Sequence, residues 1–387
     1  MQINKIYDLL IIGGGISSSV FVTSFLQDNR EARIAIVEAG RFLGGRSTTR
    51  FSNKYKDWQL NHGSPNLNIS NNTNNKELKL FINDLLHNKI IEPDNSDFIE
   101  LSSKNKLNSI KNNQFSIGKN YLSSSSMSEL SRNIIALNNL RNQIDFYFET
   151  LIVKLDFNKN HWLLFTKNGE IFRSQFLVCS SSLLLHKRSK EILNTIHIPL
   201  RQSIPKYNDK NIDFLFNLLS KQSYIPRLSF LIYTNLNYVY KDNYLKKYRY
   251  FFLSKDLQKK YKIERVIFQL QQNNKLGIVI HTKNIDFIGK YIKEENEAKF
   301  KKIILNNFNL LFEGNPLINK LINYEGISIM LWRASQPNGV GVPDSLQIFR
   351  NYKIGFCGDW FQEDGFGRIE GSIISALKLS KRFKLLI

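Results

Sequence analysis

The chain has 387 residues, of which 42% are hydrophobic and 12% aromatic, and its only cysteines are Cys179 and Cys357. This length and apolar content predict a folded protein of two or three domains and exclude a disordered chain. Two cysteines far apart in the sequence exclude a disulfide framework and a cysteine-based zinc site, and we expect no metal. They also favour a reducing compartment.

Lys and Arg number 54 against 33 Asp and Glu, which gives a net charge of +21. The lysines are spread along the chain, so we interpret the charge as a solvated surface and expect no nucleic-acid partner. A basic protein still favours an anionic substrate. No apolar signal core precedes residue 9, and no run approaches the ~18 apolar residues of a membrane span. The sequence therefore predicts a cytoplasmic protein without a membrane span.

The first predicted element is an apolar strand at 8–12, which ends in three glycines. A helix at 16–27 and a strand at 33–40 follow, so the glycines lie where a dinucleotide pyrophosphate meets a helix N-terminus. Ser18 replaces the third glycine of G-x-G-x-x-G, and a residue so small still permits close packing. Glu38 is suited to accept hydrogen bonds from ribose hydroxyls. The predicted contacts are Gly13, Gly15, Ile16, Ser17, Ser18, Glu38 and Ala39.

The next motif, "LGGRSTTR", follows the acidic residue closely. Its arginine is suited to neutralise a pyrophosphate, and its hydroxyls to donate hydrogen bonds; the alternative is an arginine on a surface loop. In "NHGSP", the glycine would let the backbone lie against a flat ring, and the histidine is a candidate catalytic residue. The predicted cofactor contacts are Gly45, Arg46, Ser47, Thr48, His62, Gly63 and Ser64.

The C-terminal segment predicts a strand at 353–357, a glycine-bearing loop and a helix from about residue 370. An acid after the strand suits ribityl hydroxyls, and the helix N-terminus would point its positive end at a flavin pyrimidine. A nicotinamide-only domain needs no such return of the chain. We therefore predict non-covalent FAD, with further contacts from Gly358, Asp359, Gly371, Ser372 and Ile373.

The blocks "IIGGGIS", "LGGRSTTR", "LWRASQP" and "GFCGDWF…GRIEGSIISAL" resemble the renalase family of amine-oxidase-like flavoproteins, with similar spacing over nearly the whole chain. The resemblance implies an α/β fold: a discontinuous, glutathione-reductase-type Rossmann-like FAD-binding domain and a mixed α+β substrate domain. It places Ile152 against the adenine. Departures include Asn61 where an acid is common, and missing glycines at 117–130.

The expected FAD-binding domain comprises residues 1–67, 143–182 and 351–387, and the substrate domain 68–142 and 183–350. An amphipathic helix is expected at 294–311. We interpret the tyrosine-rich segment 235–252 as an exposed hairpin or linker, with base stacking as the alternative. His281, on an apolar strand, is expected to be a core histidine.

The resemblance implies hydride transfer from a small-molecule donor of the dihydronicotinamide type to flavin N5, with oxygen as acceptor. Such a donor has no proton to remove first, which agrees with the lack of an evident base. His62 and Arg333, the latter in "LWRASQP", are the candidate catalytic residues. The alternatives are an amine oxidase or a carotenoid-type desaturase on the same fold, or a non-catalytic flavin- or nucleic-acid-binding protein. The sequence indicates no oligomeric state.

Overall fold

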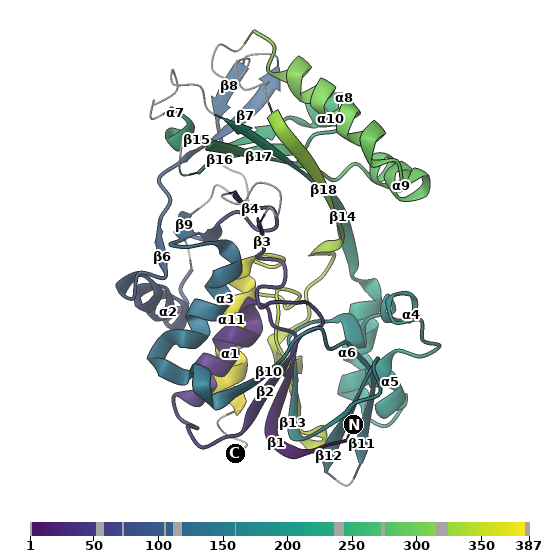
Figure 1. The fold of residues 1–387 in the computed structure, drawn as a ribbon. Coiled ribbons are helices and arrows are strands. Elements are labelled where there is room, and N and C mark those ends of the chain that lie inside the picture. The colour runs from purple at the N-terminus through teal and green to yellow at the C-terminus, as the bar shows by residue number, and fades with distance from the viewer. Residues whose placement is uncertain are drawn as a thin grey trace.

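The computed structural model describes residues 2–51, 58–71, 73–103, 106–110, 118–158, 160–235, 244–271, 275–314 and 324–383. These residues form two lobes, each with a large sheet at its centre (Figure 1). The long strands β14 and β18 run from the upper sheet toward the lower lobe (Figure 1). Among the residues described, no helix is both long and apolar enough to cross a membrane.

Parallel strands form the centre of the first sheet, where β1 (Gln2–Ile12) lies between β2 (Ile34–Val37) and β13 (Ile171–Cys179). The chain leaves β1 through α1 (Ile16–Leu26) to reach β2, which confirms the strand–helix–strand unit predicted for residues 8–40. Because the strand on the other side of β1 is β13, the strand order changes direction at β1. The remaining strands are β10 (Ile144–Tyr147), β20 (Ile354–Phe356), β12 (His161–Thr166), β11 (Ile152–Asn158) and β19 (Ile348–Phe349).

Helices cover both faces of the first sheet. On one face, α1 packs with α3 (Met127–Ala136) and α11 (Ile369–Phe383), and the Phe21 and Phe383 rings meet edge to face. This double contact explains why nearly all of α1 is buried, including Ser17, Ser18 and Ser19. The other face is covered by α5 (Pro199–Ser203) and α6 (Lys210–Lys221), whose apolar side chains join those of β11 and β12. The short α4 (Ser189–Ile192) precedes them.

The second sheet has one helix-covered face and one face directed at the first lobe. Its strands are, in order, β18 (Tyr324–Asn338), β14 (Ser223–Asn235), β17 (Lys275–Thr282), β16 (Arg265–Leu270), β15 (Tyr248–Leu253), β7 (Asp97–Ser103) and β8 (Lys106–Ser109). The covering helices are α8 (Lys255–Tyr261), α9 (Ile285–Glu294) and α10 (Glu297–Leu311), packed through an apolar cluster that includes Phe300 and Phe308. On the opposite face, β4 (Gln59–Asn61) approaches β17. A Cβ on Gly277 would lie 1.8 Å from the Leu60 side chain, so only glycine permits this approach.

Parts of both segments of the expected substrate domain pack on the first sheet and not with the second. Among the described residues of 68–142, β7 and β8 alone join the second sheet; α2 (Lys76–His87) and α3 pack with α1 and α11 instead. Small sheets link these parts: β3 (Thr49–Phe51) with β4, and β5 (Leu67–Ile69) with β9 (Lys119–Ser123) and β6 (Ile91–Pro93). Residues 183–222 likewise pack on the first sheet. The apolar faces of these helices pack against the first sheet. The order of the segments in the sequence did not indicate which sheet they would cover.

The tyrosine-rich segment is not an exposed linker where the structure describes it. After α7 (Tyr244–Lys247), it forms β15, which lies inside the second sheet between β16 and β7. Tyr250 is buried and donates a hydrogen bond to Asp94 (2.7 Å). The expectation was wrong for 248–252 because its alternating aromatics fill a sheet face; residues 236–243 lie outside the described residues.

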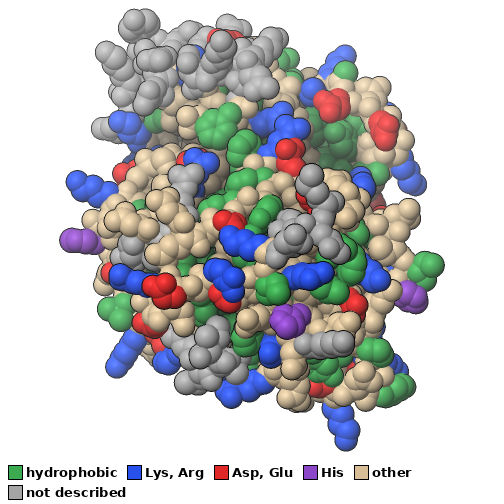
Figure 2. Space-filling model, turned by 60° about the horizontal axis from the view of Figure 1, so that its bottom comes forward, with side chains coloured by type: hydrophobic (Ala, Val, Ile, Leu, Met, Phe, Trp, Pro, Cys, Tyr) green, Lys and Arg blue, Asp and Glu red, His purple; other side chains and the backbone are tan. Residues whose placement is uncertain are grey.

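The amphipathic helix expected at 294–311 is α10, but it starts three residues later. α9 ends before Glu295, which has a left-handed backbone (φ 49°). Asn296 then caps α10 by accepting from the Lys299 N–H (3.1 Å). On the face drawn in Figure 2, basic side chains are spread among acidic and polar ones, as expected for a solvated basic surface.

Candidate functional site

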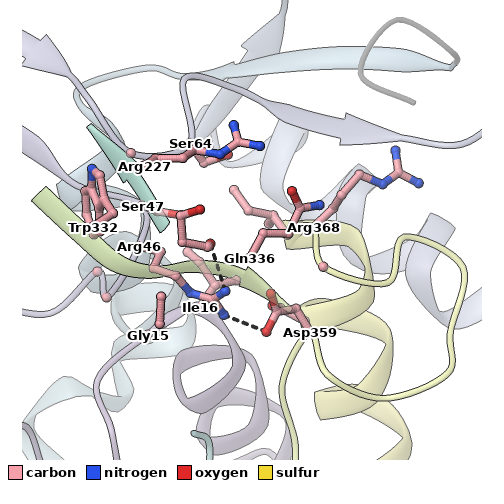
Figure 3. Close-up of a pocket in the computed structure, with 18 of the residues that line it drawn as sticks. Gly15, Ile16, Arg46, Ser47, Ser64, Arg227, Trp332, Gln336, Asp359 and Arg368 are labelled. Atoms are coloured by element: carbon pink, nitrogen blue, oxygen red, sulfur yellow. Dashed lines mark hydrogen bonds and ion pairs between the residues drawn. The ribbon is translucent and has the colours of Figure 1, made fainter. Parts of the chain in front are cut away.

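A cavity lies at the carboxyl ends of β1, β2, β13 and β20, where open α/β sheets bind ligands, and the second sheet forms its roof (Figure 3). Its floor comes from the turns that follow those strands. One wall comes from the loop that precedes β3 and the loop that follows β4. The floor residues are Gly13, Gly14, Gly15, Ile16, Ser17, Glu38, Ser180, Ser181, Ser182 and Asp359, and the wall residues include Gly45, Arg46, Ser47, His62, Gly63 and Ser64.

The N-terminus of α1 opens into the cavity. Gly13 takes a left-handed backbone (φ 102°) and donates its N–H to the Val37 carbonyl (2.8 Å), which directs the chain into the helix. Gly15, the N-cap, makes no side-chain cap hydrogen bond, and a Cβ placed on it would meet no atom within 4 Å. Since the first N–H groups of a helix lack intrahelical partners, this end of α1 offers donors and a positive dipole to an anion.

Glu38 is fixed beside this helix by two backbone donors. Its Oε2 accepts from Gly14 N–H and its Oε1 from Gly40 N–H, both at 2.6 Å. Each carboxylate oxygen has a second lone pair. The carboxylate is thus held rigidly at the cavity edge and can accept two further hydrogen bonds from a diol.

Arg46 is held by an ion pair rather than left free. Its Nη2 lies 2.5 Å from Asp359 Oδ1, and its Nη1 donates to the Ser335 carbonyl (3.1 Å). Asp359 is buried, whereas the Arg46 side chain is 40% exposed. The two residues predicted to contact different parts of the cofactor are therefore partners. Figure 3 shows their ion pair close to Ile16 at the start of α1.

Close backbone packing sets the position of the wall. A Cβ on Gly63 would lie 2.0 Å from the Arg46 carbonyl oxygen, so the loop after β4 lies directly on the loop before β3. Gly44, in turn, forms a bridge with Gly15 and has a left-handed backbone (φ 126°). These contacts bring the arginine loop and the α1 N-terminus to one place.

His62 is buried in the cavity wall beside Trp332, with ring centroids 5.2 Å apart. Its Nε2 lies 3.3 Å from Thr48 Oγ1, while its buried Nδ1 has no hydrogen-bond partner. Burial, together with the nearby Arg50, lowers the pKa of His62 to about 4. The ring is thus neutral at physiological pH and a weak base there.

The roof is built from side chains that alternate along adjacent strands. Within it, Arg227 pairs in register with Trp332, and Arg265 with His281. Neither arginine was predicted from the sequence to be a site residue. The available signal was an arginine directly before an apolar run, in "RLSF" and in "RVIF". The roof residues that line the cavity are Phe98, Arg227, Ser229, Tyr250, Phe252, Arg265, Ile267, His281 and Trp332.

His281 is a core histidine, as expected, and it also lines the cavity. Its Nδ1 accepts from Arg265 Nε (2.8 Å), and its Nε2 donates to the His62 carbonyl (3.0 Å). This pattern fixes a neutral tautomer. Burial and the two nearby arginines, Arg265 and Arg227, lower the pKa of His281 well below its usual range.

Several predicted cofactor contacts do not line the cavity. Ser18 is fully buried and donates to the Gly15 carbonyl (2.6 Å), so it supports the glycine turn from behind. Ala39 is exposed, and Thr48 contributes through its contact with His62. Ile152 lies in the apolar cluster on the far side of the first sheet.

The C-terminal predictions divide in the same way. Asp359 and Ser372 line the cavity, whereas Gly358, Gly371 and Ile373 do not. Gly371 is packed against the Gly365 carbonyl, where a Cβ would lie 2.6 Å from its oxygen. Arg333 is exposed and outside the cavity lining, because alternation along β18 gives the lining position to Trp332.

Arg188 is a further cavity residue that sequence reasoning missed. Its guanidinium stacks 3.6 Å from the centroid of the Tyr224 ring and donates from Nη2 to Ser182 Oγ (3.3 Å). Its buried Nε and Nη1 have no partner. In the portion of the chain that is described, no group of three or more His, Cys, Asp or Glu is placed to hold a metal.

Residues 11–85 match the family model described as NAD(P)-binding Rossmann-like domain. Solved structures share the fold along essentially the whole chain. A putrescine oxidase bound to putrescine is 9% identical with a TM-score of 0.65, and covers 100% of this chain and 99% of that one. A putative protoporphyrinogen oxidase from Exiguobacterium sp. 255-15 is 10% identical with a TM-score of 0.66, and the match covers 97% of this chain and 98% of that one. Cyclohexylamine oxidase from Brevibacterium oxydans IH-35A is 10% identical with a TM-score of 0.65, and the match covers 98% of each chain.

No curated protein sequence matches the chain. At 10% identity or less, the structural likeness concerns the fold alone. It confirms the predicted α/β class with a Rossmann-like dinucleotide-binding domain and a second, mixed domain.

Proposed function

We propose that this protein is an FAD-dependent oxidoreductase of the renalase-like kind, which oxidises a dihydronicotinamide-type donor with oxygen as acceptor. One observation carries the proposal. Three segments far apart in the sequence, around Gly15, Arg46 and Asp359, meet at one cavity whose open floor is a helix N-terminus. A site for a nicotinamide dinucleotide alone needs only the first of them.

The residues present fit non-covalent FAD. The α1 N-terminus would hold the pyrophosphate, since the space beside Gly15 is open and its N–H donors are free of a side-chain cap. Glu38 would accept from the adenosine ribose, and Asp359, with Arg46, would orient the ribityl chain. Cys357 is buried outside the cavity lining, so it offers no covalent attachment.

The flavin would supply the chemistry, accepting a hydride from the donor. The chain's own part is to hold the donor between the floor and the roof and to exclude water. A dihydronicotinamide loses hydride without prior proton removal, which suits a wall whose nearest histidine, His62, is a weak base at neutral pH. The roof ring of Trp332 would stack on the donor or limit its position.

Amine oxidation on the same fold is the second candidate, because two of the structurally similar proteins are named putrescine oxidase and cyclohexylamine oxidase. An amine that binds as a cation would enter a cavity lined by five arginines and two acids, Glu38 and Asp359. This charge balance favours the dihydronicotinamide donor.

Anaerobic mixing of purified protein with candidate donors, followed by flavin absorbance, tests the proposal. We expect dihydronicotinamide isomers to reduce the flavin faster than putrescine or cyclohexylamine, and air to reoxidise it with release of hydrogen peroxide. Rapid reduction by an amine and none by any dihydronicotinamide would establish the amine-oxidase candidate instead. A colourless protein that cannot be reconstituted with FAD would contradict both.

A further inference from the structure

The ion pair in the cavity floor leaves the predicted pyrophosphate site short of positive charge. Arg46 Nη2 lies 2.5 Å from Asp359 Oδ1, so these two charges cancel each other (Figure 3). The other acid of the floor, Glu38, adds a negative charge beside the N-terminus of α1. The three predicted segments therefore offer a diphosphate little more than the partial positive charge of a helix N-terminus.

Arg188 brings a further cation to the same cavity. It is the N-cap of α4, and its partly buried side chain lines the cavity. The ionisable groups that act on it are Tyr224, Arg46 and Asp359, and the one acid among these three is already paired with Arg46. Within the described part of the chain, no acid forms an ion pair with Arg188. Its positive charge is therefore not balanced by the protein.

The Arg188 side chain is held in a fixed position. Its guanidinium stacks 3.6 Å from the centroid of the Tyr224 ring, and its Nη2 donates to Ser182 Oγ (3.3 Å). The Tyr224 hydroxyl is hydrogen-bonded to the same Ser182 oxygen. At the other end, the Arg188 backbone N–H donates to Nδ1 of His186 (3.2 Å). A side chain that is already ordered loses little conformational entropy when it binds a ligand.

These contacts tie Arg188 to the turn that lies against the glycine turn of β1. Ser182 belongs to the turn after β13, which begins at Ser180. Ser180 Oγ donates to the Ile12 carbonyl (3.0 Å), and a Cβ on Gly13 would lie 2.6 Å from the same oxygen. The anchor of Arg188 is thus next to the turn that leads into α1, where the pyrophosphate is predicted.

The charges around Arg188 favour a bound anion. Burial lowers the pKa of Arg188, and the neighbouring Arg46 acts in the same direction. Two cations that lie near each other away from bulk water repel, and Asp359 forms its ion pair with Arg46 alone. A ligand with two negative charges would relieve this repulsion, because it stabilises both cations at once.

We propose that Arg188 neutralises the diphosphate of FAD, the role that the sequence predicted for Arg46. This inference rests on the proposed function, which places FAD in this cavity, and it holds whichever donor reduces the flavin. Arg46 then serves mainly to hold Asp359 for the ribityl chain. A guanidinium suits this task because its planar fork matches phosphate oxygens. A phosphate of the donor is the other source of such an anion, and the test separates the two.

The test measures the binding of FAD and of riboflavin to the full-length apoprotein by fluorescence titration. Riboflavin has the flavin ring and the ribityl chain but no phosphate. Arg188→Gln should weaken FAD binding by about 10- to 100-fold, the factor for one lost charge-assisted hydrogen bond. Its affinity for riboflavin should stay within about two-fold of the wild-type value.

Arg201→Gln is the matched control. Arg201 also stacks on an aromatic ring, 3.9 Å from the centroid of Phe216, but it is paired with Asp213 and lies outside the cavity lining. This variant should bind FAD normally. If Arg188→Gln does not fold, Arg188→Lys decides: it keeps the charge without the fork, so FAD binding should weaken by about three- to ten-fold.

Thermal unfolding separates a cofactor role from a structural one. Arg188→Gln removes an unbalanced, partly buried cation, so the Tm of the apoprotein should stay the same or rise. The increase in Tm that FAD produces should be smaller than in the wild type, because the affinity is lower. An arginine needed only to pack on Tyr224 would give the opposite pattern: a lower Tm without FAD and an unchanged increase with it.

The remaining outcomes distinguish this inference from the proposed function. FAD affinity within about two-fold of wild type in Arg188→Gln would overturn the inference, as would an equal loss for riboflavin. Unchanged FAD affinity with a raised KM for a phosphate-bearing donor would assign the cation to the donor instead. A wild-type protein that binds no FAD would contradict the proposed function itself. FAD binding through Arg188, without reduction by any dihydronicotinamide, would support the inference and overturn only the proposed donor.

Discussion

The floor and the roof of the cavity are built on different principles. The floor uses backbone groups and small residues: the open space at Gly15, the two N–H groups that hold Glu38, and the close approach at Gly63. The roof uses long side chains, such as Arg227 and Trp332, that project from neighbouring antiparallel strands. A backbone-built floor suits a constant ligand such as a cofactor, whereas side chains can be exchanged without changing the fold, and they suit substrate selection.

The floor and the roof should also differ in how well they tolerate amino-acid substitutions. A floor glycine cannot gain atoms without losing the ligand or moving a neighbouring loop. A roof side chain can be shortened while its strand keeps its ladder. We therefore expect floor variants to affect cofactor retention and roof variants to affect the choice of donor.

The largest effect is expected at Gly15. Its backbone (φ −83°, ψ −176°) is open to any residue, and added atoms would meet the empty cavity rather than protein. Gly15→Val should therefore fold with a nearly unchanged Tm yet lose FAD affinity by about 100-fold or more, the upper range for overpacking. Fluorescence titration of the apoprotein with FAD measures this. Gly289→Val, also beside open space but in α9, should bind FAD normally; normal FAD binding by Gly15→Val would remove α1 from the cofactor site.

Glu38 and Arg46 come next. Glu38→Ala and Arg46→Ala should each weaken FAD binding by about 10- to 100-fold, because each removes charge-assisted hydrogen bonds worth roughly 1.5–3 kcal/mol. Arg46→Ala should also lower the Tm, since it leaves the buried Asp359 unpaired. Equilibrium dialysis gives the affinities. Glu77→Ala, which breaks only a surface pair with Lys381, serves as the control, and unchanged affinity in both test variants would place the cofactor elsewhere.

His62 should matter less than its position suggests. Its pKa of about 4 keeps the ring neutral from pH 6 to pH 8, so His62→Ala should slow flavin reduction by less than about ten-fold and leave the pH profile unchanged there. The loss of a true general base would cost about 10²- to 10⁴-fold. Stopped-flow measurement of the flavin reduction rate across this pH range distinguishes the small loss from the large one. A collapse of the rate with FAD still bound would assign a catalytic role to His62.

The same histidine should contribute to acid sensitivity. The unfolded chain protonates this ring near pH 6.5 and the folded protein only near pH 4, so the unfolded state binds more protons in between. The free energy of unfolding should therefore fall as the pH drops from 6.5 to 4, and it should fall less in His62→Ala. Urea unfolding at several pH values measures the slope, with exposed His87→Ala as the control.

The smallest effect is expected at Arg333. Its side chain is exposed and outside the cavity, so Arg333→Ala should change the rate of flavin reduction by no more than about two-fold, as for an ordinary surface substitution. Trp332→Ala, one residue earlier on the roof face, should raise the KM for the donor. A larger effect at Arg333 than at Trp332 would mean that the roof is assembled differently in solution.

The sequence by itself indicated the floor. The glycine turn, the acid that ends β2 and the paired glycines before Arg46 are local signals, because a tight turn and a helix start depend on residues a few positions apart. Because these signals are local, the sequence also predicted the positions of β1, α1, β2 and α10. The limit to local signals also explains the error at Arg333: the strand was evident, but which of two neighbouring residues lined the cavity depended on the register of β18 against β14.

Only the tertiary structure decided the roof and the division of the chain between the sheets. Arg227, Arg265, His281 and Trp332 are separated by up to about a hundred residues, and antiparallel pairing brings them onto one face. Likewise, α2 and α3 have ordinary amphipathic faces, which do not specify which sheet they cover. Sequence patterns fix which face of an element is apolar, whereas the partner of that face is set by packing between distant segments.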